Sequence, residues 1–215
     1  CGSGMKAAMI GFDQIKLEQS QTLAVGGMES MSNAPYLLQK MRSGARLGHG
    51  KVVDHMFLDG LEDAYEPGRL MGTFAEDCAE KYQFTREAQD DYALTSLENS
   101  LSAQKVGAFE NEIRTVEVTD RKGAKSLVLL DEQPQNARPD KIPYLKPAFR
   151  KNGTVTPANS SSISDGAAAL ILASKSYSEK EGLPVRARIL GHSSYAHAPG
   201  LFTTAPVYAV KNLLK

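Results

Sequence analysis

The chain has 215 residues, with 25 basic and 25 acidic side chains and a net charge of zero, so it is not built to bind nucleic acid or anionic membranes by bulk electrostatics. Hydrophobic residues make up 41% and charged residues 23%, which is ordinary globular usage and excludes a disordered or fibrous chain. No apolar stretch approaches the roughly 20 residues that span a bilayer, and no charged leader precedes one, so we expect a soluble, intracellular protein.

Cysteine and histidine usage excludes two further classes of site. Cys1 and Cys78 are too few and too far apart for a disulfide framework or a metal knuckle. The four histidines lack ligand spacing beside cysteines or paired carboxylates, so no metal site is expected. Because the chain begins at Cys1 without an initiator methionine, it is expected to be either processed there or a piece of a longer protein.

The first elements are a helix and a strand. Apolar residues from Met5 to Ile15 follow the i, i+3, i+4, i+7 spacing of a helix buried on one face, with Cys1 at its N-terminus. The apolar run Thr22 to Val25 predicts a buried strand, and Gly26-Gly27 predicts a tight turn after it.

Residues 33–156 change to mixed polar segments without a continuous apolar strand. Thr73 and Glu76 have the spacing of a capping box, followed by a helix whose apolar face carries Cys78. Thr85 is a candidate N-cap for a second helix that ends at Gly107. Within the same stretch, residues 113–118 and 126–130 are expected to pair as strands, and 134–147 to form an ordered surface loop.

The pattern of a buried core returns after residue 156. Small apolar residues at 167–173 predict a strand covered on both faces. A short polar helix is expected at 177–181, a further strand at 187–190, and a final helix that opens at Pro206. This order predicts an α/β domain interrupted by a long excursion.

Cys1 is the strongest candidate for chemistry. A cysteine at a helix N-terminus faces the positive end of the helix dipole, which favours the thiolate nucleophile. The glycines around it let the backbone approach a substrate carbonyl, and nearby amides can stabilise an oxyanion. The alternative, a small buried hydrophobic residue, fits the local pattern equally well.

Two other segments have a functional and a structural interpretation. Residues 26–32 place flexible backbone beside two methionines, but these side chains also suit a gap in the core. Residues 159–166 are rich in serine and could donate hydrogen bonds to a ligand amide. A loop whose side chains bond their own backbone is the commoner structure for such a segment.

Taken together, four segments in order along the whole chain resemble the thiolase family, and most closely the acetyl-CoA acetyltransferases. They are residues 1–7, 26–32, 70–76 and 153–169, which read CGSGMKA, GGMESMS, LMGTFAE and GTVTPANSSSISDGAAA. The resemblance implies a layered α/β thiolase fold, with a mixed sheet, helices and an inserted α+β loop domain. It also implies a homodimer or homotetramer and no cofactor beyond the coenzyme A (CoA) thioesters that serve as substrates.

The resemblance implies a specific reaction. Cys1 would attack acetyl-CoA and form an acetyl thioester, which a second, deprotonated acetyl-CoA attacks to give acetoacetyl-CoA and CoA, or the reverse. The inserted domain would cover CoA. The positions that match residues along the pantetheine tunnel are Leu61, Met71, Leu145, Phe149, Ser161 and Phe202.

The chain also departs from the family. Leu70 stands where several relatives have histidine beside the methionine. The segment near Gln135 lacks an arginine often found there for the CoA nucleotide; Arg138 or Lys141 could substitute for it, or both could be solvated surface charges. The family's Asn-Glu-Ala-Phe, Gly-His-Pro and Cys-x-Gly segments do not occur, and His192, His197 and Cys78 lie outside such contexts, so none is assigned a catalytic role.

We therefore expect an internal fragment of a thiolase. Residues 1–32 and 157–184 would belong to the family's N-terminal half, 33–156 to the loop domain, and 185–215 to the start of the C-terminal half. Three alternatives stay open: a degradative thiolase with longer-chain preference, a hydrolase that uses Cys1 and its α-amine, and a catalytically incomplete CoA-binding fragment.

Overall fold

The computed structural model describes residues 1–215 and divides them into two compact units, residues 1–74 with 162–215, and residues 75–161. Its six strands form three separate two-stranded antiparallel sheets. The elements of the first unit are α1 (Ser3–Lys16), β1 (Thr22–Ser30), η1 (Met31–Asn33), β2 (Tyr36–Leu38), η2 (Met41–Ser43), β3 (Val52–Asp54), η3 (Phe57–Leu61), β6 (Asp165–Ala173), α5 (Lys175–Lys180), η5 (Pro199–Thr204) and α6 (Ala205–Leu213). Helix α2 (Met71–Tyr82) begins in this unit and continues into the second, whose other elements are α3 (Arg86–Lys105), β4 (Val116–Thr119), β5 (Lys125–Val128), α4 (Glu132–Asn136) and η4 (Pro139–Tyr144).

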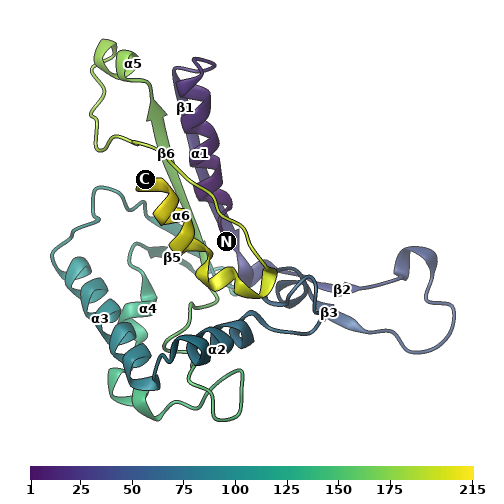
Figure 1. Ribbon diagram of the computed structural model, residues 1–215. Coiled ribbons are helices and arrows are strands. Elements are labelled where there is room, and N and C mark those ends of the chain that lie inside the picture. Colours follow the sequence, from purple (N-terminus) through teal and green to yellow (C-terminus); the bar gives the residue numbers. More distant parts are fainter. The chain divides into compact units, whose positions relative to one another are not determined.

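The longest sheet is the antiparallel ribbon of β1 and β6, which pairs Thr22 with Ala173 and Ser30 with Asp165 (Figure 1). Both strands were predicted from apolar runs, and both are confirmed but longer. The predicted turn at Gly26-Gly27 is wrong, because β1 continues through it. A Cβ atom on Gly26 would overlap the carbonyl oxygen of Ala168, so glycine here permits close strand pairing rather than a reversal.

Helix α1 packs on one face of this ribbon, as the spacing of its apolar residues predicted (Figure 1). Gly11 is buried, and a Cβ atom there would lie 2.7 Å from Cγ1 of Val25 and 3.1 Å from Cδ1 of Leu172. On the opposite face, Ala24 and its cross-strand partner Ile171 are exposed. The expectation that β6 is covered on both faces is therefore wrong within this chain, because α1 covers only one.

The two helices predicted after β6 are confirmed, whereas the strand predicted at 187–190 does not form. The hydroxyl of Ser174 accepts a hydrogen bond from the amide of Tyr177 and caps α5, and Pro206 lies in the first turn of α6. Residues 187–190 have no regular structure. A strand needs a neighbour for its backbone N–H and C=O groups, and no strand of residues 1–215 pairs with this segment.

In the second unit, helix α3 has both of its predicted ends. The hydroxyl of Thr85 accepts a hydrogen bond from the amide of Ala88 at 3.2 Å. At the other end, Gly107 has a φ of 65°, and the amide of Ala108 donates to the carbonyl of Ala103 at 3.0 Å. This is the left-handed glycine termination expected where the helix meets a residue without a Cβ atom.

The predicted capping box at the start of α2 is wrong. The helix begins two residues earlier, at Met71, and the hydroxyl of Thr73 donates to the carbonyl of Leu70 at 2.7 Å. Glu76 does not reach back to the helix start. Its carboxylate, only 3% exposed, accepts hydrogen bonds from the amides of Thr154 and Val155 in the second unit.

The rest of the second unit surrounds a small core. Ala79, Ile142 and Val155 are its buried apolar side chains. The predicted strand pair is confirmed as the β4–β5 hairpin, with shorter strands than expected. Residues 134–147, expected as a loop, include most of α4 and all of η4, since burial of Ile142 fixes a helical turn there. None of the helices combines the length and apolar composition needed to cross a membrane.

Candidate active site

Cys1 lies just before the N-terminus of α1, as predicted, and is exposed. The N-cap position is Gly2, whose backbone carbonyl accepts from the amide of Lys6 at 2.9 Å. No side chain caps the helix, so the first-turn amides remain available for an anion. This placement suits a thiolate nucleophile, because the helix end stabilises negative charge on the sulfur and on an oxyanion beside it.

Two glycines hold this end of α1 close to the sheet. A Cβ atom on Gly27 would lie 3.0 Å from Cα and 3.3 Å from the backbone nitrogen of Gly4. The helix start and strand β1 therefore touch backbone to backbone, which larger residues at position 27 would prevent. The position of Cys1 is set by this contact rather than by contacts of its own side chain.

The predicted tunnel residues of the first unit are Leu61, Met71 and Phe202. Leu61 is the last residue of η3 and Met71 the first of α2, and both are half-buried. Phe202, in η5, packs edge-on against Phe74, with ring centroids 5.9 Å apart. Because Phe74 lies one turn after Met71, the structure brings Phe202 to the first turn of α2.

The positively charged side chain of Arg69 also packs over the Phe74 ring. The guanidinium carbon of Arg69 lies 3.8 Å from the centroid of the Phe74 ring, and the side chain also pairs with Glu66. Phe74 is 2% exposed, so it forms a buried platform for Phe202, which itself remains 43% exposed. Apart from the apolar character of Phe74, no sequence pattern predicts this platform.

The other three predicted residues belong to the second unit. Leu145 ends η4 and Phe149 follows in a bend, and both side chains are half-buried. Ser161 is exposed at the end of the loop that precedes β6. Their segments are joined by a backbone hydrogen bond from the amide of Ala148 to the carbonyl of Val155, at 2.9 Å.

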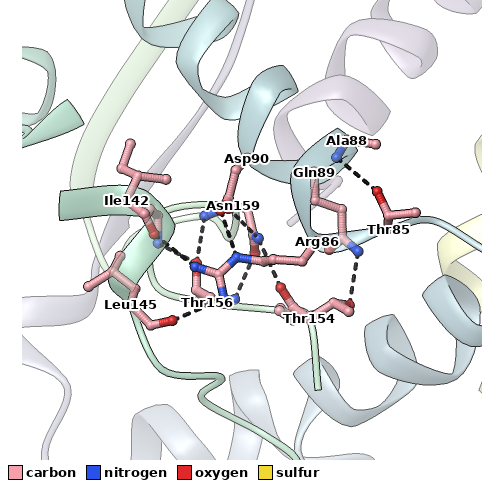
Figure 2. A network of polar contacts seen from close by, with 12 residues as sticks. Thr85, Arg86, Ala88, Gln89, Asp90, Ile142, Leu145, Thr154, Thr156 and Asn159 are labelled. Carbon is pink, nitrogen blue, oxygen red and sulfur yellow. Dashed lines mark hydrogen bonds and ion pairs between the residues drawn. The ribbon is translucent and has the colours of Figure 1, made fainter. Parts of the chain in front are cut away.

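A buried polar network connects the same two segments (Figure 2). Arg86 Nε donates to Asp90 Oδ2 at 2.7 Å, while its two terminal nitrogens donate to the carbonyls of Ile142 and Leu145 at 2.8 and 3.0 Å. Asp90 Oδ1 accepts from Asn159 Nδ2 at 3.1 Å. Sequence reasoning missed this network, although Arg86 and Asp90 have the i, i+4 spacing of a helical ion pair.

At the start of the serine-rich segment 159–166, Asn159 and Ser160 bond the backbone of the residues just before them, as the commoner interpretation has it. Asn159 Oδ1 accepts from the amide of Thr156 at 2.7 Å, and the hydroxyl of Ser160 donates to the carbonyl of Thr156 at 2.7 Å. At its C-terminal end, Asp165 Oδ1 accepts from the amide of Ser32. This hydrogen bond holds the pKa of Asp165 below its ordinary value of 3.8.

His192 and His197 each have a hydrogen-bond partner, and the second cysteine lies within a helix. His192 Nε2 lies 2.8 Å from Asp13 Oδ1, with its ring edge-on to Phe12 of α1. His197 Nε2 lies 2.6 Å from the carbonyl oxygen of Leu201. Cys78 is a free, half-buried cysteine within α2. No group of three or more His, Cys, Asp or Glu side chains in residues 1–215 could hold a metal ion.

The order of these segments matches that of a known family. Residues 1–176 match the thiolase N-terminal domain. The chain belongs to the thiolase family. It is 47% identical over 215 residues to a probable acetyl-CoA acetyltransferase of Dictyostelium discoideum, a match that covers 100% of the chain and 52% of that relative.

Solved thiolase structures confirm the α/β thiolase fold. The acetyl-CoA acetyltransferase of Syntrophomonas wolfei matches with a TM-score of 0.91 and 40% identity, over 100% of this thiolase chain and 53% of its own. The Acat5 thiolase of Ascaris suum, solved in complex with coenzyme A, matches with a TM-score of 0.89 and 38% identity, over 100% and 54%. The chain thus spans about half the length of the thiolases it matches. Its assignment to parts of the family's two halves and loop domain stays a prediction.

Proposed function

We propose that this chain is part of an acyltransferase that condenses two molecules of acetyl-CoA to acetoacetyl-CoA and CoA, or catalyses the reverse thiolysis. The proposal rests on Cys1, exposed beside the uncapped first turn of α1, in a chain similar to enzymes named acetyl-CoA acetyltransferase. We place the enzyme in the cytoplasm as a homodimer or homotetramer, without a metal or an additional cofactor, on the family resemblance alone.

In the first half-reaction, the thiolate sulfur of Cys1 attacks the carbonyl carbon of acetyl-CoA. Negative charge develops on the carbonyl oxygen, and the uncapped amides at the start of α1 are suited to stabilise it. The carbon–sulfur bond to CoA then breaks, so that the acetyl group remains on Cys1 and CoA leaves as the thiolate, which takes up a proton.

In the second half-reaction, another acetyl-CoA loses a proton from its α-carbon. The resulting carbanion attacks the acetyl carbonyl on Cys1, a carbon–carbon bond forms, and the bond to the Cys1 sulfur breaks, which regenerates the thiolate. We assign neither proton transfer to residues 1–215, since His192 and His197 lie outside a Gly-His-Pro segment. The proposed roles of Leu61, Met71, Leu145, Phe149, Ser161 and Phe202 are to line or hydrogen-bond the pantetheine arm.

The proposal is tested by acetylation of the chain with acetyl-CoA, followed by mass spectrometry of the intact protein and its peptides. The α-amine of Cys1 is blocked before the reaction, because a free amine there would take the acetyl group from the neighbouring sulfur as a stable amide. We then expect one acetyl group on Cys1 that hydroxylamine removes, as a thioester requires, and none in Cys1→Ser. The matched control, Cys78→Ser, should acetylate at the wild-type rate, because Cys78 lies inside a helix. Equal labelling of Cys1→Ser and wild type would contradict the assignment of the nucleophile.

The same assay separates the alternatives. Faster acylation by longer acyl-CoA thioesters than by acetyl-CoA would favour a degradative thiolase. CoA binding without acetylation of Cys1 would instead identify a CoA-binding chain that lacks the first chemical step.

A further inference from the structure

We propose that Arg86, Asp90 and Asn159, called here the Arg86 network, are positioning residues for CoA binding by the second unit. The inference rests on the proposed function, which assigns Leu145, Phe149 and Ser161 to the pantetheine arm. These three residues belong to two chain segments, 142–149 and 154–161, and the Arg86 network bonds to both (Figure 2).

Arg86 fixes the first segment. All three nitrogens of its guanidinium group are used, one on Asp90 and the others on the carbonyls of Ile142 and Leu145. The guanidinium is planar, so these bonds set the direction as well as the distance of the backbone at Leu145. The backbone that carries the Leu145 side chain is therefore held by a helix residue 59 positions earlier in the chain.

Asn159 fixes the second segment. Its amide nitrogen donates both to Asp90 Oδ1 at 3.1 Å and to the carbonyl of Thr154 at 3.0 Å, while its oxygen accepts from the amide of Thr156. Thr156 is fully buried, with 0% exposure. The loop is thus tied to α3 two residues before Ser161.

Asp90 is the shared residue of the Arg86 network. Its carboxylate is buried: Oδ2 accepts from Arg86, which bonds the first segment, and Oδ1 accepts from Asn159 in the second. A buried ion pair gives little net stability compared with apolar residues of the same size, because both charges lose their hydration. Its directional bonds instead fix geometry, and a binding site requires that geometry to within a fraction of an ångström.

The test uses the full 215-residue chain and near-isosteric changes. Asn159→Asp places a carboxylate against Asp90, and Asp90→Asn places one amide nitrogen against another. The double variant Asp90→Asn/Asn159→Asp exchanges donor and acceptor and restores their hydrogen bond, at the cost of the bond to Thr154. Thr85→Ala is the control, because it removes the cap of the same helix without touching either segment.

Two measurements are made below the melting temperature of every variant. The Kd for CoA, from calorimetric titration, should rise about tenfold in each single variant, as for loss of one hydrogen bond to a charged group. The double variant should recover most of this loss, and Thr85→Ala should bind CoA as the wild type does while melting at a lower temperature. Wild-type affinity in both single variants would overturn the inference and leave the proposed function intact.

Amide hydrogen exchange tests the coupling of the two segments independently of CoA. In Asn159→Asp, exchange should accelerate in 142–149 and 154–161 together, and remain at the wild-type rate in both segments in Thr85→Ala. Faster exchange confined to one segment, or spread over the whole second unit, would show that the Arg86 network does not couple them. If the wild type binds no CoA, the CoA-binding part of the proposed function fails, and the exchange result alone establishes or overturns the coupling.

Discussion

Removal of the Glu76 carboxylate is expected to be among the most damaging single changes in the second unit. Oε1 accepts hydrogen bonds from the amides of Thr154 and Val155 at 3.1 and 2.9 Å, and Oε2 is 2.9 Å from the amide of Thr154. Val155 is 5% exposed and Glu76 3%, so water does not easily replace these bonds. In Glu76→Ala two backbone N–H groups lose their acceptor, at about 1–3 kcal/mol each.

We therefore expect Glu76→Ala to lower the free energy of unfolding by about 2–6 kcal/mol. Glu76→Gln keeps one oxygen in place but turns an amide nitrogen toward the backbone, so its loss should be smaller, about 1–2 kcal/mol. The measurement is urea unfolding followed by circular dichroism, since the chain has no tryptophan for fluorescence.

The matched control is Glu80→Ala, one turn further along the same helix. Glu80 has a side chain 75% exposed and a single ion pair with Arg150, so its removal should change stability by less than about 0.5 kcal/mol. If Glu76→Ala were no more destabilising than Glu80→Ala, the buried amides would have found other acceptors, and the reasoning from Glu76 would be wrong.

Two further predictions concern the first unit. Gly27→Ala should displace the start of α1, because the added Cβ lies 3.0 Å from Gly4 Cα. We expect about 1–3 kcal/mol of destabilisation in urea unfolding and slower acetylation of Cys1. Gly50→Ala, where the added Cβ has no atom within 4 Å, should leave acetylation unchanged. The hydrogen bond from the Ser32 amide lowers the pKa of Asp165 in the folded state. Ionised Asp165 therefore stabilises the fold above pH 4, and this stability is lost as the pH falls through the folded-state pKa. Unfolding midpoints of wild type and Asp165→Asn should thus converge between pH 5 and pH 2, and a constant difference across that range would refute this.

Local signals predicted local structure well. Thr85 and Gly107 marked both ends of α3, because an N-cap hydroxyl and a left-handed glycine satisfy backbone groups within a few residues of themselves. The capping-box prediction at Thr73 and Glu76 was wrong although the spacing was right, because Glu76 binds partners far away in the sequence. The Glu76 carboxylate, which a capping box would have turned to the helix start, instead accepts hydrogen bonds from the amides of Thr154 and Val155, 78 and 79 positions away in the sequence.

The candidate site, too, was predictable from the sequence only in part. Cys1 could be placed at a helix N-terminus from the apolar spacing that follows it, and the structure confirms this placement. The Arg86 network could not be found, because polar residues on a helix usually face solvent and no local pattern distinguishes Asp90 from an exposed acid. The burial of Asp90 and its partners depends on carbonyls supplied by η4 and the residue after it, and on an amide supplied by the loop before β6.

By itself, the sequence determined the balanced charge, the apolar face of α1, both ends of α3 and the order of motifs that resembles a thiolase. Each of these depends on residues close together in the chain, where spacing alone fixes which groups meet. Only the tertiary structure decided that Gly26 and Gly27 continue a strand, that residues 187–190 lack a partner, and that Glu76 and Asp90 are buried. These outcomes depend on atoms brought together from distant positions, because the close approach of Gly4 to Gly27 and of α3 to the 154–161 loop exists only once the chain has folded.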